Sequence, residues 1–161
     1  MNKLISKWYR RGGANLKVSS KGEYALRALL VLGQYQEEVL SITDIAEKTM
    51  VTVKYLEQIM SQLKKMGYVE SKRGAQGGYQ LRMKPTEINI GTIIRQLEGP
   101  LSPMGCTSVT SYEPCSLEPE CLLKPFWALI RNTIADILEQ TSLDDLLKGN
   151  IPHRNKKGLL V

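Results

Sequence analysis

Histidine, phenylalanine and cysteine are scarce in this sequence of 161 residues, which has one His, one Phe and three Cys. The single histidine, His153, lies in a polar segment close to the end of the sequence. A nucleophilic cysteine needs a neighbouring base, and no histidine lies near the three cysteines along the chain. The sequence therefore argues against a thiol enzyme, and we expect a protein that is not an enzyme.

Long apolar runs are also absent. The apolar run at residues 25–33, ALRALLVLG, contains Arg27 and falls short of the ~18–20 residues that a membrane span needs. The first residues are basic but lack the apolar stretch of a secretory signal. We therefore expect a cytoplasmic protein. In that compartment, clustered cysteines bind metal or sense redox state more often than they form disulfides.

The net charge of +6 is distributed unevenly. Residues 1–16 carry four Lys or Arg and no acid, and residues 17–84 carry eleven Lys or Arg against seven Asp or Glu. Residues 85–161 reverse the balance, with seven against nine. A basic front half indicates a polyanionic partner such as nucleic acid, although a solvated surface has the same composition.

Three helices are predicted in the front half. An apolar helix covers residues 20–35, with Ser19 or Ser20 as its N-cap. A short helix follows at 41–49, where a Ser-x-x-Asp pattern resembles a capping box. After a tight turn, Thr52 can cap a third helix at 52–66, and its buried side would be formed by Leu56, Ile59, Met60 and Leu63.

Two short strands, at 68–72 and 79–82, flank a glycine-rich tip and predict a β-hairpin. The order helix, short helix, tight turn, helix, hairpin is typical of a winged helix-turn-helix. We therefore predict a mainly α fold with a small β-hairpin. In that fold the helix at 52–66 reads DNA, and its exposed polar side chains contact phosphates and base edges. Lys72 and Arg73 on the hairpin would contact an adjacent minor groove.

The back half contains a helix at 89–99 capped by Asn89, a proline-rich loop and a long amphipathic helix. The loop holds all three cysteines, Cys106, Cys115 and Cys121. The final helix carries an apolar stripe too wide for one small domain to cover, which indicates dimerisation; its members are Phe126, Leu129, Ile130 and Ile137. The predicted organisation is a basic extension (1–15), the winged helix-turn-helix (16–84), a connecting helix with the cysteine loop (85–124), a dimerisation helix (125–147) and a flexible tail (148–161).

Three segments resemble one family closely. The stretches SKGEYALRAL, KYLEQIMSQLKKMGYVESKRGAQGGYQL and INIGTIIRQLEGPLSPM are similar to the bacterial iron–sulfur-cluster regulators, which are winged-helix repressors of the IscR, NsrR and CymR type. The resemblance covers residues 16–147. It implies a homodimeric repressor that binds an operator with two half-sites. It also implies base contacts from Tyr55, Glu57 and Gln58, backbone contacts from Thr52 and Lys54, and a minor-groove contact from Arg73.

The resemblance extends to the cysteines, because cluster-binding members place three Cys between the corresponding helices. It implies that Cys106, Cys115 and Cys121 bind an iron–sulfur cluster, with [2Fe–2S] favoured over [4Fe–4S]. One branch has a histidine where this sequence has Lys124, so the fourth ligand must differ. The nitric-oxide-sensing branch supplies a carboxylate from the first helix of the opposite subunit, and Glu23 occupies that position. Glu113, Glu118 and Glu120 in the loop compete with it.

Other interpretations stay open. The three thiols with one oxygen ligand also suit Zn²⁺. The family includes cysteine-free members that respond to a metabolite or a protein partner, so a regulator without a cluster is the main alternative. Relatives begin near residue 16, and Leu16 can be encoded by a start codon, so we expect the natural protein to start there; otherwise residues 1–15 form a basic arm that contacts phosphates.

Overall fold

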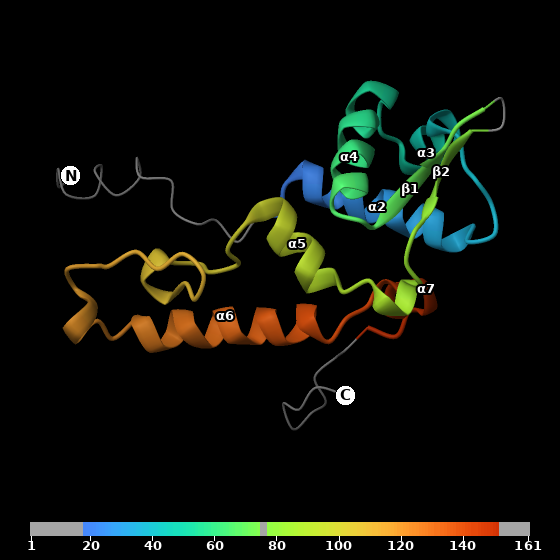
Figure 1. Cartoon of the computed structure of the whole chain (residues 1–161). Coiled ribbons are helices and arrows are strands. Elements are labelled where there is room, and N and C mark those ends of the chain that lie inside the picture. Colours follow the sequence, from blue (N-terminus) through green and yellow to red (C-terminus); the bar gives the residue numbers. More distant parts are fainter. Residues whose placement is uncertain (1–17, 75–76, 152–161) are drawn as a thin grey trace.

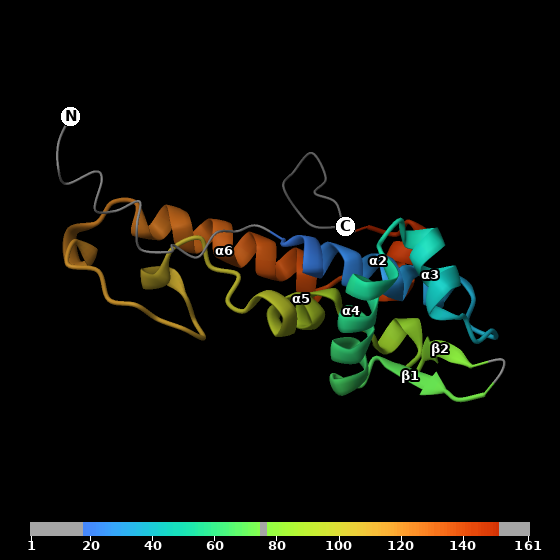
Figure 2. The ribbon, with the colours of Figure 1, turned by 90° about the horizontal axis from the view of Figure 1, so that it is seen from above.

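The computed structural model describes residues 18–74 and 77–151, so the predicted extension 1–15 and most of the predicted tail lie outside the described residues. Two parts are visible in Figure 1. One is a cluster of helices with a hairpin, and the other is a long helix that extends away from this cluster and carries an irregular loop at its far end. Figure 2 gives the same arrangement from above, with the hairpin and the loop at opposite ends of the molecule.

The first three helices lie close to their predicted ranges. They are α2 (Ser20–Gln34), α3 (Ile42–Thr49) and α4 (Val53–Lys65). The Ser19 hydroxyl accepts from the Gly22 amide and thereby caps α2. At α3, Ser41 and Asp44 form the predicted capping box. Each cap satisfies amides that a helix start would otherwise leave unpaired, which explains why the helices begin at these residues.

The core-facing side of α4 is as predicted, since Leu56, Ile59, Met60 and Leu63 are all buried. The predicted cap of α4 is only partly right. Thr52 has the extended backbone of an N-cap residue, but its side chain makes no capping hydrogen bond. The first turn of α4 is therefore held by backbone bonds from Tyr55 and Leu56 to the Thr52 carbonyl.

Met50 occupies the turn between α3 and α4 in an unusual conformation. Its φ of 56° is left-handed, and its side chain is 90 % exposed. This geometry costs an L-residue about 1–2 kcal/mol because the Cβ atom approaches the following carbonyl, whereas glycine adopts it freely. Met50 therefore introduces backbone strain at the tightest point of the helix-turn-helix.

Met50→Gly is expected to raise the free energy of unfolding by about 1 kcal/mol, since the strain is relieved and little burial is lost. Urea denaturation followed by circular dichroism measures it. Met104→Gly is the matched control, because Met104 has an ordinary φ of −139° and gains nothing from the change. If Met50→Gly is no more stable than the parent protein, contacts of the Met50 side chain outweigh the strain.

The hairpin consists of β1 (Val69–Lys72) and β2 (Gly78–Leu81), paired antiparallel with Val69 opposite Leu81. Tyr79 exchanges two backbone hydrogen bonds with Leu40, which ties the hairpin to the α2–α3 connection. Gly78 has a steric role here, because a Cβ atom at this position would lie 2.2 Å from the Leu40 carbonyl oxygen. One glycine of the predicted tip is therefore required by packing.

The chain continues through the 3-10 turn η1 (Pro85–Glu87) into α5 (Ile90–Glu98), which is capped by Asn89 as predicted. The loop that follows contains two further 3-10 turns, η2 (Gly105–Thr107) and η3 (Glu118–Glu120). Glu98, at the end of α5, accepts hydrogen bonds from the Ser19 amide and hydroxyl. This contact fastens the start of α2 to the last residue before the loop region.

The single helix predicted at residues 125–147 is wrong, because two helices occupy this region. They are α6 (Lys124–Glu139) and α7 (Leu143–Lys148). Ser142 starts α7 with its own capping box to Asp145, and the Ile90 amide donates to the Thr141 carbonyl between the two helices. The break lets Leu143 become fully buried, and α7 packs against α2.

The core lies within the winged-helix part. Most of its fully buried side chains come from α2, α3, α4, α5 and α7, with Ile45, Leu56 and Ile93 at 0 % exposure; Val69 on β1 and Ile88 before α5 complete it. In contrast, α6 buries none of its sixteen residues. Within residues 18–74 and 77–151, no helix has both the length and the apolar character that crossing a membrane requires.

Candidate functional site

The solvent side of α4 carries polar side chains in the order the sequence predicts. Thr52, Lys54, Glu57 and Gln58 are exposed, whereas the opposite side of the helix is buried in the core. The buried side fixes the position of the helix, so the exposed side chains project from a rigid support. A helix held in this way can insert its exposed side into a DNA major groove.

Tyr55 differs from its neighbours on α4 because its ring is only partly exposed. The ring meets that of Tyr24 on α2 edge-to-face, with centroids 5.9 Å apart. The Tyr24 ring in turn lies 5.5 Å from the Arg27 guanidinium carbon. Tyr55 therefore packs against α2 at the edge of the polar face. Its exposed part stays available for the DNA contact that the resemblance implies.

The hairpin carries two basic side chains. Lys72 ends β1 and Arg73 follows it, and both side chains are exposed. Among the described residues, the recorded ion pairs lie outside α4 and the hairpin, on Arg27, Arg95, Lys124 and Lys148. The ammonium of Lys54 and the guanidinium of Arg73 are therefore not neutralised by a carboxylate within the described chain. Such cations are suited to phosphate oxygens.

The first cysteine sits on a well-anchored turn. Cys106 is the middle residue of η2, and the hydroxyls of Ser102 and Thr107 lie 2.7 Å apart and both donate to the Met104 carbonyl. Arg131 on α6 donates to the Thr107 carbonyl. These contacts hold η2 against α6 and fix the backbone that carries Cys106.

The other two cysteines flank η3. The Glu118 amide donates to the Cys115 carbonyl over 3.0 Å, and the Cys121 amide donates to the Glu118 carbonyl over 3.4 Å. The Glu118 carboxylate accepts from the Lys124 ammonium and, over 2.5 Å, from the Tyr112 hydroxyl. Glu118 therefore connects the two ends of the segment that carries Cys115 and Cys121.

The charge states of this network follow from its hydrogen bonds. The bond from Lys124, with a smaller contribution from Tyr112, holds the pKa of Glu118 below its usual value. The bond to Glu118 raises the pKa of Lys124. At neutral pH Glu118 is ionised and Lys124 is protonated, so Lys124 has no lone pair for a metal. Of the acids in the loop, Glu118 is already engaged, whereas Glu113 lies against Gly105, beside Cys106.

The three thiols are unpaired and partly exposed. Thiolates are the ligands that iron–sulfur clusters and Zn²⁺ prefer, so the donor set fits either group chemically. Within the described residues, however, no three Cys, His, Asp or Glu side chains are gathered closely enough to hold a metal ion. The loop therefore supplies suitable donors on separate turns, and binding would require η2 and the η3 segment to approach each other.

Glu23 lies in the first turn of α2 with an exposed side chain. Its carboxylate pairs with Arg27 over 2.5 Å, and Arg27 also donates to the Thr49 carbonyl at the end of α3. Within one chain Glu23 is thus part of the winged-helix unit. The contact that the resemblance implies would come from a second chain.

Sequence reasoning did not identify Tyr112 or Arg131. Tyr112 contacts Glu118 within the irregular loop, and Arg131 contacts Thr107 from α6. Neither residue belongs to a motif. Arg131 lies 24 residues from Thr107, the residue whose carbonyl it contacts. Such contacts become visible only when the loop and α6 are placed together.

Comparison with known proteins gives a consistent result. Residues 18–149 match the family model Rrf2, described as an iron-dependent transcriptional regulator. The chain is 38 % identical to the HTH-type transcriptional regulator CymR of Bacillus subtilis over 132 residues, which cover 81 % of this chain and 89 % of that one. It is also 38 % identical to the HTH-type transcriptional regulator NsrR of Geobacillus kaustophilus over 144 residues, covering 83 % and 97 %.

A solved structure of IscR from T. potens superposes with a TM-score of 0.65 at 36 % identity, covering 83 % of this chain and 88 % of that one. These similar proteins are transcriptional regulators rather than enzymes, in agreement with the sequence prediction. Regulators with three different names match at nearly equal identity. Overall similarity therefore identifies the family and does not distinguish among these three regulators.

Proposed function

The chain belongs to the Rrf2 family of transcriptional regulators, and from this premise we propose that it is a homodimeric repressor that reads an operator with α4 and the hairpin. The observation that carries the proposal is the division of α4 into a buried side and an exposed polar side beside two exposed cations of the hairpin. In this arrangement α4 enters the major groove, with Glu57 and Gln58 at base edges. Thr52 and Lys54 contact the phosphate backbone.

The roles of the hairpin and of Tyr55 follow from their positions. Arg73 and Lys72, at the end of β1 near the hairpin tip, reach the minor groove beside the site of α4. Tyr55 contacts a base edge with its exposed part while its ring stays packed on Tyr24. Because this packing orders the side chain before DNA binds, less conformational entropy is lost on binding.

We infer that the cysteine loop is the sensing element. Cys106, Cys115 and Cys121 would hold an iron–sulfur cluster, with [2Fe–2S] favoured, and Glu23 of a second chain or Glu113 would provide the fourth donor. A cluster bound there supplies a centre that reacts with oxidants or nitric oxide. The chain's own contribution is to hold the two turns that carry the thiols, η2 through its contact with α6 and the η3 segment through the Glu118 bridge.

Dimerisation is proposed through α6. The helix buries none of its residues, and its apolar stripe leaves Phe126 51 % and Leu129 62 % exposed. Leu122 and Leu123, just before α6, are also exposed, at 93 % and 59 %. A second copy that packs along this stripe would cover these exposed apolar side chains.

Replacing Gln58 by Ala is expected to weaken binding to a selected operator by about 1–3 kcal/mol and to relax sequence preference at one base pair, because a bidentate contact to a base is lost. Arg73→Ala should lower operator affinity as well, because the proposed minor-groove cation is lost, and should reduce the salt dependence of binding. Fluorescence anisotropy at several salt concentrations measures both effects. Gln140→Ala, at the exposed end of α6, is the control and should bind like the parent protein.

The docking arrangement is wrong if both variants keep the parent affinity and sequence preference on the same operator. If Gln58→Ala alone keeps the parent affinity and the parent sequence preference, other residues read the bases.

A further inference from the structure

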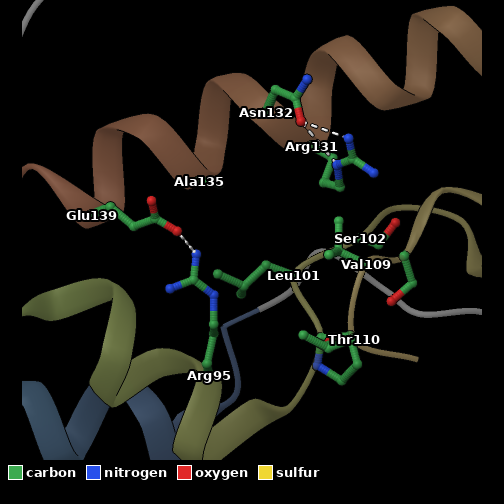
Figure 3. Close-up of a pocket in the computed structure, with 11 residues that line it drawn as sticks. Arg95, Leu101, Ser102, Val109, Thr110, Arg131, Asn132, Ala135 and Glu139 are labelled. Carbon is green, nitrogen blue, oxygen red and sulfur yellow. Dashed lines mark hydrogen bonds and ion pairs between the residues drawn. The ribbon is translucent and has the colours of Figure 1, made fainter. Parts of the chain in front are cut away.

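A cavity of about 320 Å³ lies between α5, α6 and the first part of the cysteine loop. Figure 3 shows its walls, with Arg95 rising from α5, Leu101 and Val109 contributed by the loop, and Arg131 and Glu139 projecting from α6. Its size is at the lower end of the range for small-molecule sites in proteins. None of these residues belongs to the proposed DNA contacts or is one of the thiols.

The cavity is positively charged at one end. Arg131 donates to the side-chain oxygen of Asn132 over 3.0 and 2.7 Å and to the Thr107 carbonyl, and all of these acceptors are neutral. Among the described residues, no carboxylate pairs with Arg131. Arg95, at the other end, is paired with Glu139. Arg131 is therefore the guanidinium in this cavity whose charge is not balanced, and a guanidinium is well matched to a carboxylate.

The remaining walls are largely apolar. Leu101 and Val109 from the loop and Ala135 from α6 line the space between the two arginines. Val109 is a β-branched aliphatic residue that is 79 % exposed, so its side chain is open to a ligand that enters the cavity. A ligand with a charged head and a short apolar body would satisfy both ends of this surface.

The cavity lies on the side of α6 opposite the apolar stripe. Arg131, Ala135 and Glu139 recur every four residues, and at about 100° per residue they face away from Ile130 and Ile137. A second copy packed on the stripe would therefore leave the cavity accessible. The cavity and the proposed dimer interface can be occupied at the same time.

We propose that this cavity is a binding site for a small carboxylate with a short branched apolar body. The carboxylate accepts from the Arg131 guanidinium, and the apolar body lies against Leu101, Val109 and Ala135. The same guanidinium holds the Thr107 carbonyl next to Cys106, so an occupied site contacts the element that carries the first thiol. The use of such a ligand as an effector rests on the proposed function, whereas binding itself does not.

The test uses 4-methylpentanoate as the probe and 4-methylpentanamide as its neutral counterpart of the same shape. Binding to the full chain is followed by methyl NMR of Leu101, Val109 and Ala135 in the absence of DNA. The carboxylate is expected to shift these resonances saturably, with an affinity about tenfold or more above that of the amide, because the amide lacks the charge that Arg131 selects.

Arg131→Met should reduce carboxylate affinity to that of the amide, and Arg131→Lys should restore part of it. Arg82→Met makes the same change at an exposed cation outside the cavity and should leave binding unaltered. Equal affinity for the carboxylate and the amide, or full carboxylate affinity in a folded Arg131→Met variant, overturns the proposal. The first comparison needs no variant, so it decides the matter even if Arg131→Met does not fold.

Because no DNA is present, a negative result here leaves the proposed operator binding intact. Conversely, failure of operator binding would leave a positive result for the cavity unchanged.

Discussion

Replacing Ile130 by Asp is expected to convert the protein into a monomer and to weaken binding to an operator with two half-sites by about 10²–10⁴-fold. Ile130 lies on the apolar stripe of α6, a helix that buries none of its residues within the chain. In a dimer formed along this stripe, the new carboxylate would lose its hydration without gaining a partner. The two half-sites would then be bound independently, and the gain from linking them would be lost.

Light scattering reports the mass, and anisotropy with one-site and two-site DNA reports the affinity. Binding to a single half-site should be unchanged, which distinguishes loss of dimerisation from loss of folding. Asn132→Asp is the control, since it places the same charge two residues away, off the stripe, and keeps an oxygen for Arg131. An Ile130→Asp protein that still scatters as a dimer would show that α6 does not form the interface.

Replacing Cys115 by Ser is expected to abolish the iron–sulfur cluster after anaerobic reconstitution. The three cysteines supply all the thiolates of the chain, and a serine hydroxyl stays protonated at neutral pH and binds iron poorly. Visible absorption, iron and acid-labile sulfide should all fall to near zero. Ser116→Ala changes the neighbouring residue, removes no thiol and should reconstitute like the parent protein.

If the parent protein is colourless and contains stoichiometric zinc, the three thiols form a zinc site and not a cluster site. A parent that binds neither metal would favour a regulator without a cofactor.

The fourth donor can be identified with the same assay. Glu23→Gln removes the charge of the proposed donor from the second chain but keeps a hydrogen-bonding group near Arg27. If Glu23 is a ligand, the iron content should be retained while the absorption spectrum and the rate of reaction with nitric oxide change. Glu113→Gln tests the acid that lies beside η2. An unaltered spectrum and rate in Glu23→Gln would leave this residue as the partner of Arg27 only.

The winged-helix part could be predicted from the sequence because its signals are local. The positions of Leu56, Ile59, Met60 and Leu63 repeat at helical spacing, and all four are buried. The Ser41–Asp44 box and the Asn89 cap each join residues three positions apart, so the capping contact predicted from the sequence pattern is the one that the structure contains. Local consistency of this kind is the condition under which sequence patterns are reliable.

The failures have non-local causes. Residues 125–147 read as one amphipathic helix, but the backbone bond from Ile90 to Thr141 and the burial of Leu143 divide it. The cavity was not foreseen because its two arginines lie on different helices, with Arg95 paired to Glu139 at a separation of 44 residues. The left-handed conformation of Met50 was also missed, since glycine or asparagine is the residue that usually marks such a turn.

The attachment of α6 has a mechanical consequence. Its C-terminal end is fixed to the winged-helix unit, because the Asn89 side chain donates to the Glu139 carbonyl over 2.7 Å and Arg95 pairs with the Glu139 carboxylate. Sixteen residues at about 1.5 Å each make α6 a lever of about 24 Å, with the cysteine loop at its free end. A tilt of about 10° at the fulcrum displaces that end by about 4 Å. In the proposed dimer, two reading helices would have to match half-sites about 34 Å apart, and a tilt of this size would be large enough to alter their register on DNA without the loop approaching it.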